Sequence, residues 1–163
     1  MSDRGTKILE GIEKKMKGSG MDEVRMVYAG ENGVSRDTLT TLHRGFGSIS
    51  NLAEGEFCFA GSKDDEPARF VARIAFASEL SSDVIPALTA RIAVINAEVA
   101  AGAYEYDPVD DELSFALKVP VADGLSDDKL SEMIGSDIAI ALSVGEQYAA
   151  ELLELSKGNG GEF

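Results

Sequence analysis

Apolar residues dominate two short segments in the middle of the chain, 56–61 and 69–77. In the second segment one face is wholly apolar and is formed by Phe70, Ala72, Ile74 and Phe76. A polar turn over 62–67 joins the two segments, so the pattern predicts an antiparallel hairpin. The wholly apolar face is the candidate core, and the opposite face is half apolar.

Apolar residues at helical spacing predict three helices, near 7–17, 83–101 and 126–155. The central helix has a continuous apolar stripe, which is formed by Val84, Leu88, Ile92, Ile95 and Val99. We expect this stripe to be buried against the sheet. The predicted helix N-caps are serines, namely Ser81 or Ser82 for the central helix and Ser126 for the last.

A second hairpin is predicted after the central helix, with strands over 103–107 and 112–121 and an acidic turn between them. The second strand alternates apolar with polar side chains, which is typical of a sheet with one buried face. A further strand is expected over 24–29. The segment 34–55 alternates weakly, and for it we expect a loop with one short strand.

The order helix, strands, helix, two strands, helix predicts an α+β fold, in which helices pack on one face of an antiparallel sheet. A chain of 163 residues and 17.3 kDa fits one domain over 1–163. Within it we expect 6–156 to be structured and 157–163 to form a flexible tail.

Composition excludes several classes of protein. Hydrophobic residues make up 44% and charged residues 27% of the chain, which excludes a fibrous or wholly disordered protein. A single cysteine, Cys58, excludes a disulfide framework and a cysteine zinc cluster. No apolar run approaches a membrane span, and the first residues lack the apolar core of a secretory signal. We therefore expect a cytoplasmic protein that does not enter the membrane.

The net charge of −14 is concentrated in the second half of the chain. Residues 78–156 hold 3 Lys and Arg against 16 Asp and Glu. Such a surface repels phosphate backbones, so we expect no nucleic-acid partner. It would attract a basic protein or peptide, although solubility or a salty cytoplasm explains the same charge.

No residue pattern in the chain predicts an enzyme. The single histidine, His43, lies in the glycine-rich segment LHRGFG, where a surface or turn position is expected. Cys58 lies inside an apolar strand and is expected to pack as a small hydrophobe. Asp107, Asp110 and Asp111 lie in a turn without the calcium-loop pattern. We therefore predict no catalytic residue, no cofactor and no metal site.

The sequence over 68–156 resembles the YbjN family, which is similar in fold to the type III secretion chaperones. The resemblance is carried by a helix ending in Ile95-Asn96, then Gly102 and Tyr104, an acidic turn, and Leu113 with Phe115. It implies a compact acidic α+β domain, often dimeric, and the secretion chaperones hold peptide segments without catalysing a reaction. It supplies no catalytic residues, and the partner-binding residues stay unknown.

These observations favour a non-enzymatic protein- or peptide-binding module, chaperone-like or adaptor, that forms a homodimer. The alternative is a small-ligand-binding or enzymatic domain that uses the glycine-rich segment around His43. A third hypothesis is a structural or regulatory domain whose dimer covers all of its apolar surface.

Overall fold

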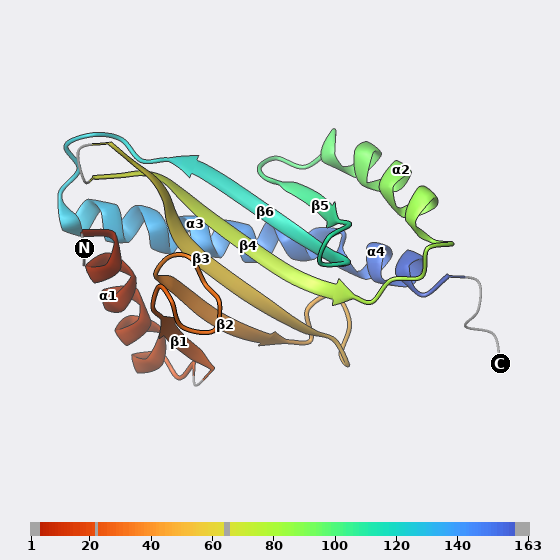
Figure 1. Cartoon of the computed structure of the whole chain (residues 1–163), viewed down its shortest axis with the longest axis horizontal. Helices are drawn as coiled ribbons and strands as arrows, with labels where there is room; N and C mark the ends of the chain where they lie inside the picture. The colour runs from red at the N-terminus through yellow and green to blue at the C-terminus, as the bar shows by residue number, and fades with distance from the viewer. Residues whose placement is uncertain (1–3, 22, 64–65, 159–163) are drawn as a thin grey trace. The chain divides into compact units, whose positions relative to one another are not determined.

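The computed structural model describes residues 4–21, 23–63 and 66–158, which form helices and strands in an α+β arrangement (Figure 1). In chain order the elements are α1 (Arg4–Gly18), β1 (Val24–Val27), β2 (Thr38–Arg44), β3 (Leu52–Lys63), β4 (Glu66–Ser78), α2 (Ile85–Asn96), β5 (Ala103–Asp107), β6 (Glu112–Pro120), α3 (Asp127–Gln147) and α4 (Ala149–Ser156).

The strands form a six-stranded antiparallel sheet in the order β1-β2-β3-β4-β6-β5. Strand β1 pairs with β2 so that Met26 lies opposite Leu39, and β5 pairs with β6 so that Tyr104 lies opposite Phe115. The predicted α+β fold class with an antiparallel sheet is therefore confirmed.

Residue contacts divide the chain into two compact units, each assembled from three separate segments. The first unit consists of Met1–Leu42, Gly55–Ala72 and Lys118–Ala139, and the second of His43–Glu54, Arg73–Leu117 and Ile140–Phe163. The boundaries fall inside β2, β3, β4, β6 and α3. The single-domain assignment stays a prediction, and most of the predicted tail over 157–163 lies outside the described residues.

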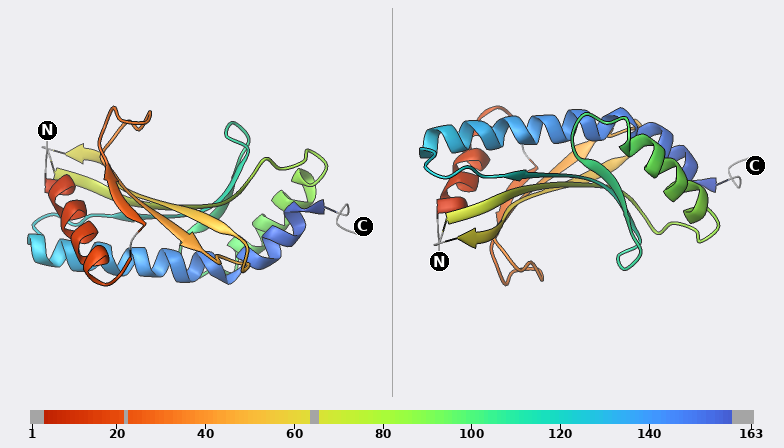
Figure 2. Two further views of the ribbon diagram at one scale, coloured as in Figure 1. Left: turned by 90° about the horizontal axis from the view of Figure 1, so that it is seen from below. Right: turned by 90° about the horizontal axis from the view of Figure 1, so that it is seen from above.

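In the first unit, α1 and the first half of α3 lie on the same face of the strands (Figure 2). The Arg4 guanidinium contacts Asp127 at 2.6 Å, which ties the start of α1 to the start of α3. Gly5 permits close packing of α1, because a Cβ there would lie 2.7 Å from the Phe59 ring. The fully buried core side chains of this unit include Leu9, Leu39, Phe57, Phe70, Leu130 and Ile134.

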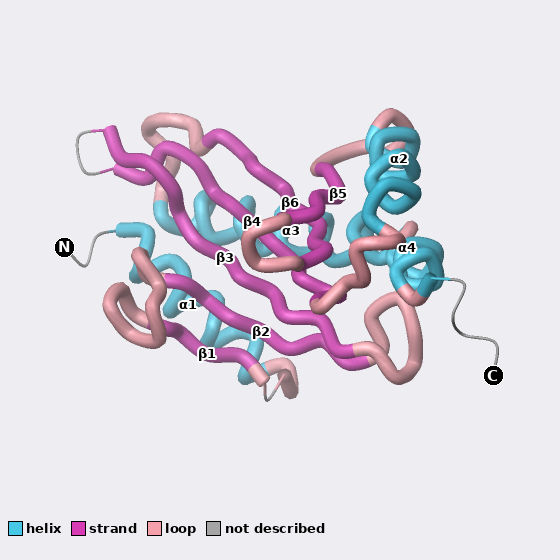
Figure 3. Tube along the Cα trace, turned by 45° about the vertical axis from the view of Figure 1, so that its right-hand side comes forward, coloured by secondary structure: helices cyan, strands magenta, loops and turns pink. Residues whose placement is uncertain are grey.

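In the second unit, α2 runs along β5 and lies beside α4 (Figure 3). The predicted apolar stripe of α2 is buried at Val84, Leu88, Ile92 and Ile95, as expected. Val99 is half-buried and lies beyond the end of the helix. The helix faces of both units are therefore apolar where they meet the strands, which is the packing that an α+β fold requires.

The central helix is shorter than the predicted 83–101. It begins at Ile85 without a side-chain cap, so neither predicted serine caps it. Ser81 Oγ instead accepts the Asp83 N–H at 3.5 Å. The helix ends at Asn96, whose side chain bonds to the backbone of Tyr104 in β5. At the last helix, by contrast, the predicted cap is confirmed, since Ser126 Oγ accepts the Lys129 N–H at 3.3 Å.

The segment 34–55 is more regular than the predicted loop with one short strand. It contains the seven-residue strand β2 and the start of β3, which begins at Leu52 rather than at residue 56. Strands β2 and β3 approach each other closely at Gly55. A Cβ at Gly55 would lie 2.4 Å from Thr41 Oγ1 and 2.9 Å from the Phe57 ring.

Truncation of Leu88, which is fully buried in α2, tests the packing of the second unit. We predict that Leu88→Ala lowers the free energy of unfolding by about 2–5 kcal/mol, because it removes core contacts and leaves a cavity. Val109 is 88% exposed, so Val109→Ala should change it by less than about 0.5 kcal/mol. Urea unfolding of both variants makes the comparison, and equal losses would contradict the packing of α2.

Candidate functional site

The residues that carry the family resemblance meet in one cluster in the second unit. Asn96, at the end of α2, accepts the Tyr104 N–H at 2.8 Å and donates its side-chain N–H to the Tyr104 carbonyl at 2.9 Å. Both Tyr104 backbone groups point away from β6, because alternate residues of an antiparallel strand bond to opposite sides. The Asn96 carboxamide therefore occupies the place of a neighbouring strand.

The Tyr104 side chain crosses from β5 to the junction between α3 and α4. Its hydroxyl donates to the Gly145 carbonyl at 2.8 Å and accepts the Tyr148 N–H at 3.0 Å. It also lies 3.1 Å from the carbonyl of Val144, which is the ordinary helical acceptor for the Tyr148 N–H. Insertion of a side chain into this hydrogen-bond ladder breaks the helix.

This insertion explains why the predicted helix over 126–155 is two helices. Tyr148, between α3 and α4, has φ −114° and ψ 4°, outside the helical range. Burial raises the pKa of Tyr104 to about 12, so its hydroxyl keeps the proton that it donates.

Two glycines make room for the aromatic rings of this cluster. Gly102 has φ +73°, and a Cβ there would lie 2.5 Å from the Phe115 ring. A Cβ at Gly145 would lie 3.0 Å from the same ring. Tyr104 stacks edge-on against Phe115, with 5.0 Å between ring centroids. The residues of this motif therefore pack tightly against one another.

A side chain also bonds to the backbone of β1, the strand at the other edge of the sheet. In the first unit, Glu13 of α1 accepts the outward-pointing Met26 N–H at 3.1 Å and pairs with Lys17 at 2.8 Å. Exposed edge strands invite pairing with other chains, and a charged side chain on the edge opposes it. The Glu13 side chain thus bonds to a backbone group of β1, and the Asn96 side chain to backbone groups of β5, that an added strand would need.

The glycine-rich segment after His43 forms a rigid turn between β2 and β3. The Gly45 N–H bonds to the Asn51 carbonyl at 2.8 Å, and Asn51 Nδ2 bonds to the carbonyls of Phe46 and Phe76 at 2.9 and 3.1 Å. Phe46 is buried with its ring centroid 5.6 Å from that of Phe76. A Cβ at Gly47 would lie 2.8 Å from Ala149 Cβ, so the turn rests directly on α4.

At the tip of this turn Ile49 is 100% exposed, and Leu52 at the start of β3 is 48% exposed. Neither residue was a candidate from the sequence. Glycines and serines around Ile49 indicate only a loop, and nothing in their order reveals that the loop is rigid.

His43 and Cys58 lie in half-buried positions on the strands. Burial lowers the pKa of His43, and nearby Glu146 only partly opposes this effect. Burial likewise raises the pKa of the Cys58 thiol, against a smaller opposing influence of Arg36. A neutral imidazole and a protonated thiol are the forms expected at neutral pH. Reactive cysteines instead need a lowered pKa, so Cys58 has the character of a packing residue.

The acidic turn between β5 and β6 uses its carboxylates to hold its own backbone and side chains. Asp107 accepts the Val109 N–H at 2.8 Å, and Asp111 accepts the Tyr106 hydroxyl at 2.9 Å. Asp111 has φ +51°, a left-handed conformation that aspartate tolerates. Among the described residues, no group of three or more His, Cys, Asp or Glu side chains could hold a metal ion.

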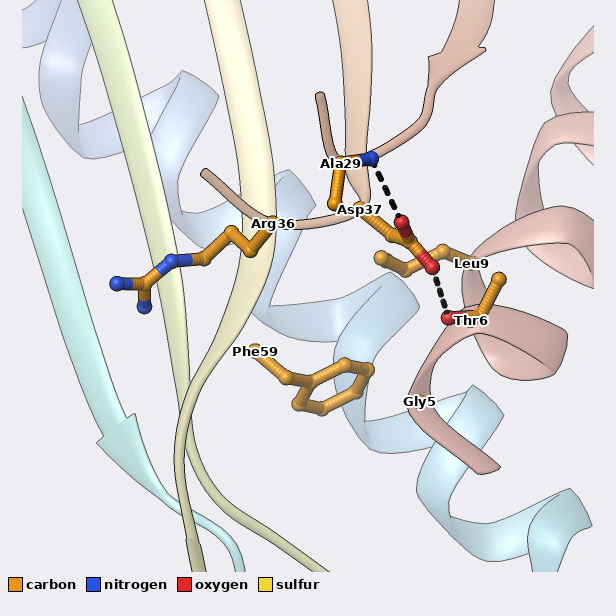
Figure 4. Close-up of a pocket in the computed structure, with 7 residues that line it drawn as sticks. All are labelled: Gly5, Thr6, Leu9, Ala29, Arg36, Asp37 and Phe59. Atoms are coloured by element: carbon orange, nitrogen blue, oxygen red, sulfur yellow. Dashed lines mark hydrogen bonds between the residues drawn. The ribbon is translucent and has the colours of Figure 1, made fainter. Parts of the chain in front are cut away.

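A cavity of about 190 Å³ lies at the start of α1 in the first unit (Figure 4). Asp37 accepts hydrogen bonds there from Thr6 Oγ1 at 2.5 Å and from the Ala29 N–H at 2.9 Å. The Arg36 side chain points away from Asp37 and from its two hydrogen-bond donors (Figure 4). The cavity is smaller than most pockets that bind ligands. The Asp37 carboxylate already accepts hydrogen bonds from Thr6 and from Ala29.

A larger cavity, of about 470 Å³, lies between the start of α2 and the end of α4 in the second unit. Val84, Ala87 and Leu155 form its apolar wall. Its charged lining residues are Asp83 and Lys157, and Lys157 is paired with Glu154 at 2.8 Å. Neither His43 nor Arg44 lines either of these two cavities, so the glycine-rich segment and the described cavities are separate features.

No family model matches the sequence, and no curated protein matches it. Among solved structures, the chain is similar to the crystal structure of YbjN, a candidate transcription regulator from E. coli. The identity is 12%, the match covers 88% of this chain and 92% of that chain, and the TM-score is 0.53. An uncharacterized protein from Methanothermobacter thermautotrophicus is also similar, at 15% identity over 91% of this chain and 99% of that chain, with a TM-score of 0.42.

The chain therefore has a YbjN-like fold, as the resemblance of its sequence implied. At this identity the likeness extends to the fold alone. None of the described helices combines the length and the apolar character that crossing a bilayer requires.

Two tyrosines in β5 offer a matched test of the hydroxyl inserted between α3 and α4. We predict that Tyr104→Phe lowers the free energy of unfolding by about 1–3 kcal/mol, because it leaves the Tyr148 N–H without its acceptor. Tyr106→Phe removes only a bond to the turn residue Asp111 and should cost less than about 0.5 kcal/mol. Chemical unfolding of both variants measures the difference, and equal effects would remove the special role of Tyr104.

Proposed function

We propose that the chain is a non-enzymatic protein-binding module, of the chaperone or adaptor kind, whose β2–β3 turn inserts Ile49 into an apolar pocket of a partner protein. The carrying observation is the fully exposed Ile49 on a turn whose backbone is held by hydrogen bonds and by the buried Phe46. A rigid loop loses little conformational entropy on binding, so an apolar anchor on such a loop contributes efficiently to affinity.

The charge of the chain favours a partner whose pocket is rimmed by basic side chains. Residues 78–156 hold 16 acidic residues against 3 basic ones, and the exposed Glu146 lies near the turn, at 3.5 Å from the Gly47 N–H. Acidic side chains steer a basic partner toward the surface, and the apolar anchor then limits its dissociation. The same charge disfavours direct contact with DNA.

The bonds at the sheet edges influence how the partner is recognised. Peptides often bind as an added strand, through main-chain hydrogen bonds at a free sheet edge. The Asn96 side chain bonds to the backbone of β5, and the Glu13 side chain to the backbone of β1, at groups that such a strand would use. Side-chain insertion at the turn is therefore the favoured mode. The YbjN structure is described as that of a candidate transcription regulator, and a module that binds a regulatory protein is compatible with it.

Introducing a charge at the tip of the β2–β3 turn tests this function. We predict that Ile49→Glu weakens capture of the partner at least about tenfold, because the pocket would have to bury a carboxylate. Val109→Glu, at the tip of the β5–β6 turn, adds the same charge at an 88% exposed position and should capture the partner as the wild type does. Quantitative mass spectrometry of proteins captured from native lysate compares the three chains.

We define the partner as a protein that the wild type and Val109→Glu capture and that Ile49→Glu fails to capture. Its association rate should fall as salt rises, while its dissociation rate changes little. Capture of the same proteins by all three chains would contradict the proposal. A photo-crosslinking residue at position 49 that joins two copies of this chain would also contradict it.

A further inference from the structure

In the first unit, the strands turn one face toward the helices and the opposite face away from them. The Phe59 ring packs against Gly5 of α1 and contacts the Phe70 ring, with 5.7 Å between ring centroids, so both rings lie on the helix side. Successive side chains of a strand point to opposite faces. Cys58 and Arg69 therefore point to the face without helices, which we call the outer face of the first unit.

The strands of the first unit are basic, although the chain as a whole is strongly acidic. Among the strand residues of this unit whose side chains the structure describes, the basic ones are Arg25, Arg69 and Lys118, and all three are exposed. The one acidic residue among them, Glu56, is half-buried. Exposed carboxylates of the same unit lie on α3, on the helix side of the strands, and belong to Asp127, Asp128 and Glu132 (Figure 2). The outer face is thus a basic region of an acidic chain.

Two arginines lie near Cys58 on this face. The Arg36 side chain points away from the cavity at α1 (Figure 4), and its guanidinium hydrogen-bonds with the Cys58 thiol. The ring contact between β3 and β4 described above places Cys58 opposite Val71, because the two strands are antiparallel neighbours. Arg69 lies two residues before Val71 on the same face, within reach of Cys58 as a diagonal neighbour.

Lys118 of β6 brings a third cation to the same place. The Val121 N–H bonds to the Ala68 carbonyl at 3.0 Å, so antiparallel pairing of β6 with β4 places Lys118 opposite Val71. Lys118 also takes part in another interaction of the chain, so the two arginines supply most of the available charge. Cys58 and Val71 are both half-buried and form a floor of small side chains between the three cations.

From this arrangement we propose that the outer face of the first unit binds an acidic peptide segment of a protein partner, whose carboxylates pair with Arg36, Arg69 and Lys118. A guanidinium group presents paired N–H donors that match the two oxygens of a carboxylate. The low floor at Cys58 and Val71 lets the backbone of the segment lie close to the strands. Because the cations are exposed, the complex is weak, and its affinity falls as salt rises.

The remainder of the chain favours a short acidic peptide over a nucleic acid as the ligand. The net charge of −14 repels a long phosphate backbone, whereas a short segment interacts mainly with charges within about 8–10 Å. Sites for single-stranded nucleic acid also expose aromatic rings on which the bases stack. In the described strands of the first unit the aromatic residues are Phe57, Phe59 and Phe70, and all three point to the helix side.

Charge reversal on the two faces of the first unit tests the site. A fluorescein-labelled oligoglutamate peptide is the probe, and fluorescence anisotropy at low and physiological salt measures its binding. Arg36→Glu and Arg69→Glu should each weaken binding at least about tenfold. Lys14→Glu makes the same change in net charge at an exposed position of α1, on the helix side, and should stay within about twofold of the wild type. Circular dichroism confirms that each variant is folded.

Cys58 provides a second measurement that needs no substitution, because it is the only cysteine of the chain. Bound oligoglutamate should slow the alkylation of its thiol by a neutral maleimide, whereas oligoglutamine should leave the rate unchanged.

Three results would overturn the proposal. The first is a wild type that fails to bind oligoglutamate at low salt, and the second is an equal loss of binding in the arginine variants and in Lys14→Glu. The third is a single-stranded oligonucleotide of equal charge that binds more tightly than the peptide. None of them bears on Ile49, which lies in the second unit and is tested by partner capture.

Discussion

The second unit depends on the pairing between one carboxamide and one peptide group. Asn96 bonds to both the N–H and the carbonyl of Tyr104, and Tyr104 is almost completely buried. A buried backbone group left unsatisfied costs about 1–3 kcal/mol, so loss of this pairing would be severe. The pairing joins the end of α2 to β5 and orients the Tyr104 side chain. Its hydroxyl then separates α3 from α4.

Much of this architecture can be predicted from the sequence, because apolar periodicity reports directly on burial. The stripe of α2 and the alternation in β4 identify the buried faces of these elements correctly. The alternation in β6 predicts one buried face, but Ser114 and Ala116 are buried as well as Leu113 and Phe115, so this strand is covered on both faces. The ends of elements are harder, because long-range bonds determine them. The division of the last helix at Tyr148 depends on a hydroxyl from β5, 44 residues away in the chain. No local pattern contains that information.

The interaction surfaces are the least predictable part of the molecule. His43 attracts attention as the only histidine, but it is half-buried in β2 and burial lowers its pKa. Ile49 is unremarkable in the sequence, and its importance comes from a turn that Phe46 and Asn51 hold in place. Such surfaces come from tertiary contacts, whereas catalytic motifs are often local in sequence.

These features suit a protein that recognises partners by side chains on rigid supports. Glu13 and Asn96 occupy backbone groups at the two sheet edges, which opposes recognition by added strands. The second half of the chain is strongly acidic, and the fully exposed Ile49 at the β2–β3 turn is available for an apolar contact.

Amide hydrogen exchange at β5 tests the central claim most directly. Tyr104 and Tyr106 point their N–H groups to the same side of the strand, away from β6. In the wild type the Tyr104 amide should be strongly protected and the Tyr106 amide should exchange faster. In Asn96→Ala, the protection of Tyr104 should fall to that of Tyr106, while Glu105, which bonds to β6, keeps its protection. Undiminished protection of Tyr104 in Asn96→Ala would contradict the account.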